Sequence, residues 1–397
     1  MPSDQETIAP CLATTGVGSL PHVSVDKAVA DILSCCPEFP YWPQLPKRSR
    51  QEDMYRQFSS GLPGVEALPA SGAEREAAVS PSWRRDDEAA SRLERVYRDF
   101  LAVDAAGPEA ALASGPGIPD RWATSPDDAP GLAALAEALG TRAVRGVKGQ
   151  ITGPISLGLA VSGPDGRALL YEDDLMDGVV RGLALKARWQ EDFLSAVTGR
   201  PVLLSVDEPY LGTFGSAYFP YSPETVQAYL EILSATLRGL WGVHCCANTD
   251  WEFILGSPVR YLSFDAHAFG TRFVLYPEAV RSFLAAGKLL AWGVVPTDAE
   301  TLAASDARGL ARVLLDHFET LVARGVPETA LTRQSMITPA CGLAGLPLDE
   351  ARRAMRVAQE VSRRVRSELG VPCDADRTGQ EGEGPGARDG PGCQAPL

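Results

Sequence analysis

Several features that identify other classes of protein are missing from this sequence. No apolar run approaches the roughly 20 residues that a membrane-spanning helix needs. Residues 1–10 have neither the positive charge nor the apolar stretch of a secretory signal. Basic residues are too few to balance the acidic ones, and the net charge of −14 disfavours binding to a nucleic acid. We therefore expect a cytoplasmic protein that binds neither membranes nor nucleic acids.

Motifs for phosphate binding and for serine nucleophiles are also missing. The sequence contains no P-loop, no glycine-rich dinucleotide fingerprint after a strand and no serine nucleophile elbow. What it does contain is eight cysteines in 397 residues. In a long chain without an export signal, these are typical of buried small residues, catalytic thiols or metal ligands rather than of a disulfide framework.

Short β-rich segments alternate with amphipathic helices from Val147 onward. One helix is marked by Ser222 as its cap, Pro223 in its first turn and Gly239 after its end. Another is expected from about 348 to 369. Alternation of this kind predicts a parallel sheet. The expected strands are Val147–Ile151, Val202–Asp207, Gly242–Cys246, Tyr261–Asp265, Leu289–Val294 and Ser335–Ala340.

Two more strands are expected near Ala13–Val17 and Tyr41–Leu45, which makes eight units. Eight units indicate an α/β fold of the (β/α)8 TIM-barrel type, although the alternation alone does not distinguish it from an open doubly wound sheet. Residues 1–372 then form one catalytic barrel, with a helical insertion at about 64–145 between the second and third strands. Residues 373–397 are rich in Gly, Pro and charge and are predicted to be a disordered tail.

A candidate metal site begins in the segment VHCCANTD at 243–250. Alternate residues of a strand face the same side, so His244 and Cys246 point one way and Cys245 points toward the helices as a packing residue. Cys341, in TPACGL, follows the last strand. The carboxyl ends of barrel strands meet at one face, so these residues can come together there.

One histidine and two cysteines with an open fourth position are typical of a catalytic zinc site. Two thiolates make the metal electron-rich, which favours holding a substrate thiol deprotonated for alkyl transfer. By itself, however, the His244–Cys246 pair is more often part of a core. Cys341 is equally compatible with a small buried residue at a strand exit.

A fourth ligand is expected from YLSFDAH at 261–267. Asp265 points inward at the end of its strand, and His267 has the same parity and is the rival candidate. A carboxylate whose oxygens accept loop amides is an equally good interpretation of Asp265.

Several motifs, in this order, resemble the catalytic barrel of cobalamin-independent methionine synthases and related methyltransferases of the uroporphyrinogen-decarboxylase-like superfamily. Besides the HxC pair and the distant CGL, the motifs are TTGVGSLPH (14–22), EDMYRQF (52–58), VKGQITGPISL (147–157), VDEPY (206–210) and WGVVPT (292–297). The resemblance covers about residues 14–345. It implies a TIM barrel that uses zinc to activate a small thiol, such as homocysteine, for methyl transfer.

The resemblance also implies roles for individual residues. His244, Cys246 and Cys341 match zinc ligands of the family, whose fourth ligand is a glutamate; here Asp265 is nearest. The remaining matches concern the substrate: Gly18 and Ser19 match the loop that holds the amino-acid carboxylate, and Asp207 matches the catalytic-site acid that binds the amino group.

Two departures from the family pattern bear on the substrates. Arg48 stands where the family has a glutamate for the amino group. Either the acceptor differs from homocysteine, or another acid such as Glu52 substitutes for that glutamate, or Arg48 is simply a solvated loop residue. The chain also has no second barrel for a folate tail, which makes it resemble single-barrel forms that accept a methyl group from a methyl-corrinoid protein. Methyl-folate is the other donor considered.

Two alternatives remain open at this point. A metal-independent decarboxylase of the same superfamily would use arginines, for which Arg48 and Arg50 are candidates. A barrel that binds zinc without catalysis would serve as a partner of a corrinoid protein.

Overall fold

The computed structural model describes residues 8–66, 81–105, 118–140, 142–216 and 219–371. At its centre is a six-stranded parallel sheet with the strand order β3-β4-β5-β6-β7-β8. Every strand lies within two residues of its predicted bounds, which confirms the predicted parallel sheet. The strands are β3 (Val147–Thr152), β4 (Val202–Asp207), β5 (Leu240–Cys245), β6 (Tyr261–Phe264), β7 (Leu289–Val295) and β8 (Ser335–Pro339).

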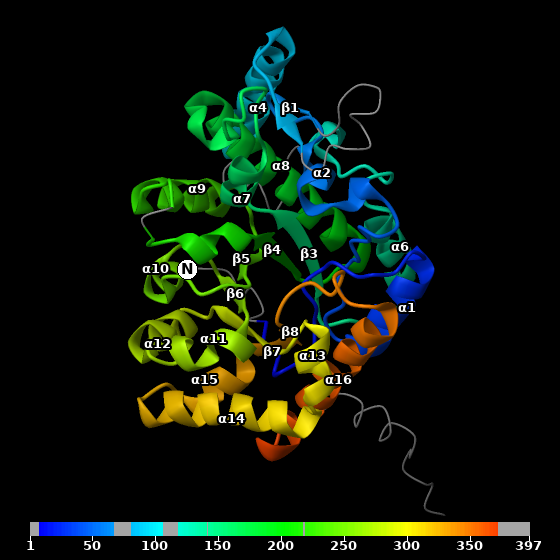
Figure 1. Cartoon of the computed structure of the whole chain (residues 1–397), viewed down its shortest axis with the longest axis vertical. Helices are drawn as coiled ribbons and strands as arrows, with labels where there is room; N and C mark the ends of the chain where they lie inside the picture. The colour runs from blue at the N-terminus through cyan, green and yellow to red at the C-terminus, as the bar shows by residue number, and fades with distance from the viewer. Residues whose placement is uncertain (1–7, 67–80, 106–117, 141, 217–218, 372–397) are drawn as a thin grey trace, which may run out of the picture.

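Helices follow the strands and cover the outside of the sheet (Figure 1). The predicted Ser222 cap is confirmed, since its side chain accepts from Thr225 N, but α9 ends before Gly239. The α-helices are α1 (Val25–Cys35), α2 (Met54–Ser59), α4 (Asp87–Ala105), α6 (Pro130–Leu139), α7 (Pro154–Ala160), α8 (Asp173–Thr198), α9 (Pro223–Thr236), α10 (Trp251–Gly256), α11 (Ala266–Phe273), α12 (Pro277–Ala285), α13 (Ala299–Ala304), α14 (Ala307–Ala323), α15 (Glu328–Arg333) and α16 (Leu348–Glu368). The 3-10 helices are η1 (Arg50–Glu52), η2 (Asp120–Trp122), η3 (Leu169–Tyr171) and η4 (Pro209–Thr213).

The two N-terminal segments expected as strands form only isolated parallel bridges. Thr14 bridges to Ile337 of β8, and Tyr41 bridges to Lys148 of β3. Pro40 and Pro43 lack the N–H that a continuous ladder needs, which accounts for the short pairing of the second segment. The described residues thus contain a six-stranded parallel sheet, and these two segments extend it at both edges. The complete (β/α)8 barrel stays an expectation.

The first and last helices lie side by side (Figure 1). Arg352 of α16 donates from Nε to Asp31 of α1 over 2.7 Å, and Gln359 donates to the carbonyl of Ser34 over 3.0 Å. These contacts join the two ends of the described chain across the outside of the sheet.

The predicted insertion adds more than helices. A two-stranded antiparallel sheet, β1 (Val65–Glu66) with β2 (Ser82–Trp83), accompanies α4 and α6. In Figure 1, α4 and β1 lie at one end of the molecule. Trp83 fixes the insertion to the loop before α8, because its Nε1 donates to the Arg167 carbonyl over 2.8 Å. The predicted tail, 373–397, lies outside the described residues.

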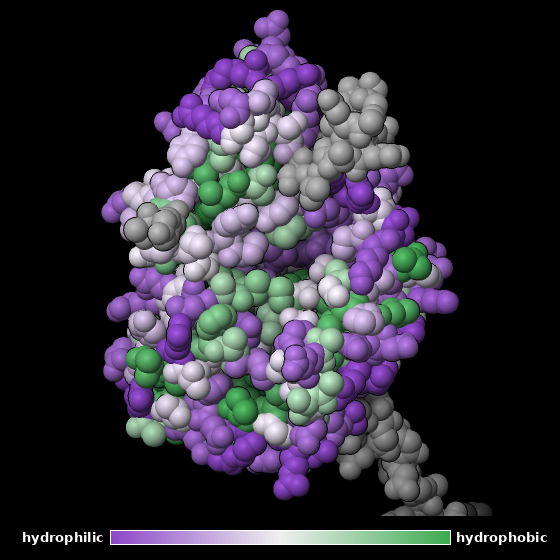
Figure 2. Space-filling model, in the orientation of Figure 1, coloured by the Kyte–Doolittle hydropathy of each residue, from purple (hydrophilic) through white to green (hydrophobic). Residues whose placement is uncertain are grey.

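The visible surface of the molecule is largely hydrophilic, with apolar residues in small separate groups (Figure 2). It is hollowed near the middle of this view. Across the described ranges, no helix combines the length and the apolar character that crossing a membrane requires.

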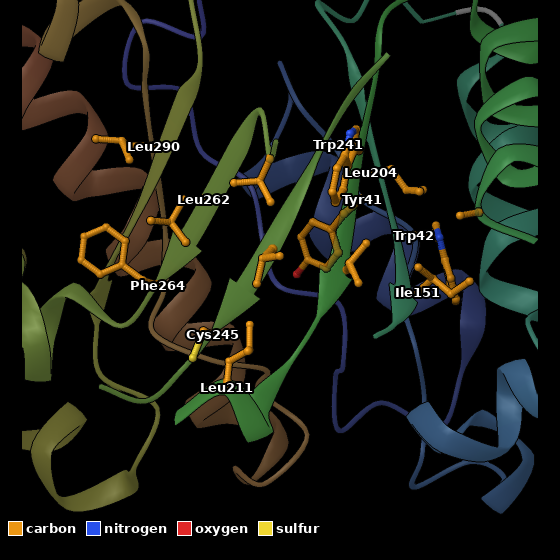
Figure 3. Close-up of a cluster of buried hydrophobic side chains, with 14 of the residues drawn as sticks. Tyr41, Trp42, Ile151, Leu204, Leu211, Trp241, Cys245, Leu262, Phe264 and Leu290 are labelled. Carbon is orange, nitrogen blue, oxygen red and sulfur yellow. The ribbon is translucent and has the colours of Figure 1, made fainter. Parts of the chain in front are cut away.

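The buried space inside the sheet is apolar at the amino ends of the strands. A separate cluster of buried side chains fills that end: Ala13, Phe39, Leu203, Tyr261, Leu289, Ala291 and Met336. The outward faces of the same strands, with Leu204, Trp241 and Leu262, pack in the larger core against the helices (Figure 3). The polar inward positions therefore gather toward the carboxyl ends of the strands.

Glu191 of α8 anchors the turn that leads into β5. Its carboxylate accepts the backbone N–H of Arg238 over 3.0 Å and the N–H of Gly239. Burial raises the pKa of Glu191 from its ordinary value of 4.5 to about 7, although the Gly239 amide and Arg188 oppose the shift. A folded-state pKa above the unfolded value means that the folded chain binds this proton more tightly.

We expect the contribution of Glu191 to stability to fall as pH rises from 4.5 through about 7, because the buried carboxyl must ionise over that range. The measurement is urea unfolding of the wild type and of Glu191→Gln at several pH values. The stability advantage of the wild type should shrink toward high pH. A difference between the two proteins that does not vary with pH would contradict this assignment.

Candidate metal centre

Inward-facing side chains of adjacent strands form one row at the carboxyl edge of the sheet. Asp207, the last residue of β4, pairs in register with His244 of β5, and His244 pairs with Ser263 of β6. Because side chains alternate along a strand, the next inward position after His244 is Cys246, just beyond the end of β5. Polar and nucleophilic groups therefore line this edge.

Cys341 reaches the same place from the other side of the curled sheet. It follows β8, which is separated from β5 by two intervening strands. The ligand atoms of His244, Cys246 and Cys341 all lie within 4.8 Å of one another. The structure thus brings together the three residues that the sequence singled out, in an arrangement that could hold a metal ion.

The imidazole of His244 is held in a way that suits a metal ligand. Its ring is buried, and Nδ1 lies 2.9 Å from Ser263 Oγ. Nε2 is buried without a hydrogen-bond partner among the described residues. A metal-bound histidine commonly uses one ring nitrogen for the ion and has the other fixed by a hydrogen bond. One imidazole nitrogen without a partner among the described residues, next to two cysteine sulfur atoms, is a set of ligand atoms that fits zinc.

The Cys246 and Cys341 thiols influence each other's pKa in opposite directions. The neighbouring Cys341 thiol and the His244 imidazole lower the pKa of Cys246, against the effect of burial. The contact with Cys246 and burial raise the pKa of Cys341. A cation bound between them would replace the remaining thiol proton, since thiolates are the ligand form.

Cys245 belongs to the core, as the alternation of side chains predicts. It lies in the apolar cluster with Leu211 between the sheet and the surrounding helices (Figure 3). Its Sγ lies 3.5 Å from the Ala247 carbonyl, and burial raises its pKa to about 12. This residue is a natural control for its neighbour Cys246.

Asp265 lies at the end of β6, but its carboxylate is outside the three-residue group. It caps α11, and its Oδ1 accepts from Ala268 N over 2.8 Å. This is a helix N-cap, in which an amide of the first turn of α11 satisfies the carboxylate. His267 follows on α11 and acts electrostatically on Asp265. Neither residue joins the group, so a protein side chain as fourth ligand stays a prediction.

Asp207 lies buried beside the candidate metal ligands. Its Oδ1 accepts from Ser205 Oγ over 3.0 Å. Burial raises its pKa, and the charges of Lys148 and His244 oppose that shift. Lys148 is itself fully buried, which lowers its pKa to about 8, and its Nζ donates to the Val17 carbonyl over 2.6 Å. A buried cation and a buried carboxylate thus balance each other under the site.

The loop with Gly18 and Ser19 lies against the loop that carries Cys341. Leu343 N donates to the Ser19 carbonyl over 2.8 Å. A Cβ atom at Gly342 would overlap Ser19 Oγ, so the absence of a side chain there allows the close approach. The predicted carboxylate-binding loop is therefore next to a candidate metal ligand.

Arg48 and Glu52 form an ion pair with each other. Arg48 Nε donates to Glu52 Oε1 over 2.6 Å, and Leu45 N donates to Glu52 Oε2 over 3.1 Å. Glu52 is buried and each of its oxygens has a partner. Their predicted part in substrate binding stays a prediction, and the structure gives Glu52 a different task, which is to hold the turn after Leu45.

Sequence analysis missed Lys148, Gln150 and Ser263. The signal for the first two was the strand VKGQIT, whose inward positions are all polar although the strand is buried throughout. Ser263 is at an inward-facing position of β6, but its role as a partner of His244 follows only from the register between β5 and β6.

Comparison with known proteins gives a structural likeness without a sequence match. No protein-family model matches the chain, and no curated protein matches it. The structure is similar to a B12-independent methionine synthase from Shewanella sp. W3-18-1 in complex with selenomethionine, at 15% identity and a TM-score of 0.54, covering 91% of this chain and 99% of that chain. A methyltransferase from Methanosarcina mazei is similar at 12% identity and a TM-score of 0.44, over 88% of this chain and 93% of that chain. The first likeness shows a shared α/β fold.

Substitution of Gly342 by alanine should disturb the candidate metal centre from outside it. The new Cβ overlaps Ser19 Oγ, so either the Ser19 hydroxyl must rotate away or the segment that carries Cys341 must move. We expect the affinity for zinc, measured by competition with a chromogenic chelator, to fall about tenfold, as for changes in residues that orient ligands. Gly345→Ala, in the same loop with nothing within 4 Å of its Cβ, is the matched control. Equal affinities for the two variants would refute this role.

Proposed function

We propose that the protein is a zinc-dependent methyltransferase that acts on a small thiol. The observation that carries this proposal is the convergence of His244, Cys246 and Cys341 within 4.8 Å at the carboxyl edge of a parallel sheet. Three protein ligands of this kind leave one coordination position for a substrate. The resemblance of the motifs to methionine synthases and the shared fold support the same assignment.

Zinc held by these three residues would bind the acceptor sulfur as a thiolate at neutral pH. The residues around it have separate tasks. Ser263 fixes the imidazole ring of His244. Asp207, whose negative charge Lys148 balances, faces the acceptor with a carboxylate that can receive an amino group. The loop of Gly18 and Ser19 lies against the loop that carries Cys341, where the acceptor carboxylate would be held.

The reaction is a displacement at a methyl carbon. The thiolate sulfur of the acceptor attacks that carbon, a carbon–sulfur bond forms, and the bond from the methyl group to the donor breaks with its electron pair left on the donor. No strong general base is needed, because the thiol proton has already been lost. A methyl-corrinoid protein and methyl-folate are the two candidate donors.

Metal analysis tests the centre directly. Purified wild type should contain about one zinc per chain, and Cys246→Ser or Cys341→Ser should contain close to none, since each loses one of three protein ligands. Cys245→Ala is the control, because this neighbouring cysteine faces the core, and it should keep its zinc. Zinc absent from carefully prepared wild type would contradict the proposal.

Methyl transfer is tested by mass spectrometry of the product thioether. Zinc-loaded protein with L-homocysteine should form methionine from methylcobalamin or from 5-methyltetrahydrofolate, and Cys246→Ser should reduce the rate about 100-fold. Decarboxylation of uroporphyrinogen by metal-free protein would favour the decarboxylase alternative. Bound zinc without alkylation of any thiol, together with a stable complex with a corrinoid protein, would favour the non-catalytic partner.

A further inference from the structure

Two buried oxygen atoms on β3 have no hydrogen-bond partner among the described residues. Gln150 and Thr152 are almost completely inaccessible to solvent, yet Gln150 Oε1 and Thr152 Oγ1 make no hydrogen bond within the described ranges of the chain. The two residues are two positions apart, so both face the inside of the sheet. Buried polar atoms normally have partners, and two such atoms on one face call for an explanation.

The orientation of the Gln150 amide is fixed by its surroundings. Its Nε2 donates to the Trp42 carbonyl over 2.8 Å. A carbonyl only accepts, so the amide nitrogen must lie on that side and Oε1 on the other. The backbone of Gln150 is also held, since its N donates to Gln190 Oε1 over 3.0 Å and its carbonyl accepts from Gln190 Nε2 over 3.1 Å. Oε1 is therefore a rigidly placed acceptor.

Both residues border the proposed substrate site. Thr152 pairs in register with Asp207, which pairs with His244. On the other side, a Cβ at Gly18 would lie 3.0 Å from the Gln150 amide. The two free acceptors thus lie between the acid beside the candidate metal centre and the predicted carboxylate-binding loop.

Two other polar groups near that place already have partners among the described residues. Lys148 lies on the same face of β3, but its Nζ donates to the Val17 carbonyl. Glu52, the sequence-based candidate for receiving an amino group, already has a partner for each oxygen. Among the described residues, Gln150 Oε1 and Thr152 Oγ1 therefore remain unpaired near the carboxylate of Asp207, and the buried hydroxyl of Tyr261 is a further unpaired group that interacts with this carboxylate.

We propose that Gln150 and Thr152 are specificity-determining residues that receive the ammonium group of the acceptor thiol next to Asp207. An ammonium has three donors, and two neutral acceptors beside one carboxylate satisfy all three. The substrate class is then an α-amino thiol, and thiols without an amino group bind poorly. This inference rests on the proposed function, because it assumes that a thiol occupies the site.

The test is calorimetric titration of zinc-loaded protein with matched thiols, and it does not depend on turnover. The probes are L-homocysteine with 4-mercaptobutanoic acid, and L-cysteine with 3-mercaptopropanoic acid; within each pair, only the amino group differs. The variants are Gln150→Met and Thr152→Val, which keep size and remove the acceptor. Thr236→Val is the control, because its buried hydroxyl bonds to the Ile232 carbonyl away from this site.

We expect the wild type to prefer an amino thiol over its partner without the amino group. Each variant should weaken binding of that amino thiol about tenfold or more, the usual effect of losing a hydrogen bond to a charged group. Binding of the thiol without the amino group should change less than about twofold, as should all binding by the control. Thr152→Val, the smaller change, keeps the test valid if Gln150→Met fails to fold.

Two outcomes overturn the inference alone: both members of a pair bind equally well to the wild type, or the variants weaken both members equally. If neither member of either pair binds the zinc-loaded wild type, the proposed function fails together with this inference. The two failures are therefore distinguishable.

Discussion

The alternation of side chains in a buried parallel sheet is the constraint on which the site depends. Every second residue of β3 to β6 faces inward, and these neighbouring strands are held in fixed register. This register places Thr152, Asp207, His244 and Ser263 in one row. A slip by one residue would turn all of them toward the helices and bring apolar side chains inside. Chemistry and packing are therefore fixed by the same hydrogen-bond ladder.

The inside of the sheet is divided along its axis. Apolar side chains such as Phe39, Leu203 and Met336 fill the end where the strands begin, and polar groups occupy the end where they finish. Lys148 pairs in register with Leu203 of the apolar region, and its buried charge is balanced by Asp207. The apolar side chains below the site lower the local dielectric on that side, and electrostatic interactions of the polar groups are stronger there.

The sequence predicted the parts of the fold that depend on local pattern. The six strands and α16 were found because apolar runs, caps and turn residues mark them directly. His244, Cys246 and Cys341 were found because they combine rare residue types with strand parity. The two N-terminal segments were overestimated as strands, since their pairing depends on distant β8 and β3. The unpaired oxygen of Gln150 could not be predicted, because it depends on Trp42 occupying the amide nitrogen.

The position of Cys341 has a consequence for how the protein matures. His244 lies on β5 and Cys246 directly follows that strand, whereas Cys341 follows β8. During synthesis, which proceeds from the amino end, a nascent chain can therefore offer at most two of the three donors until β8 has emerged and docked. Two donors bind zinc far more weakly than three. If the centre holds zinc as proposed, loading with metal would be delayed until the sheet is assembled, and it would act as a late checkpoint on the completed fold.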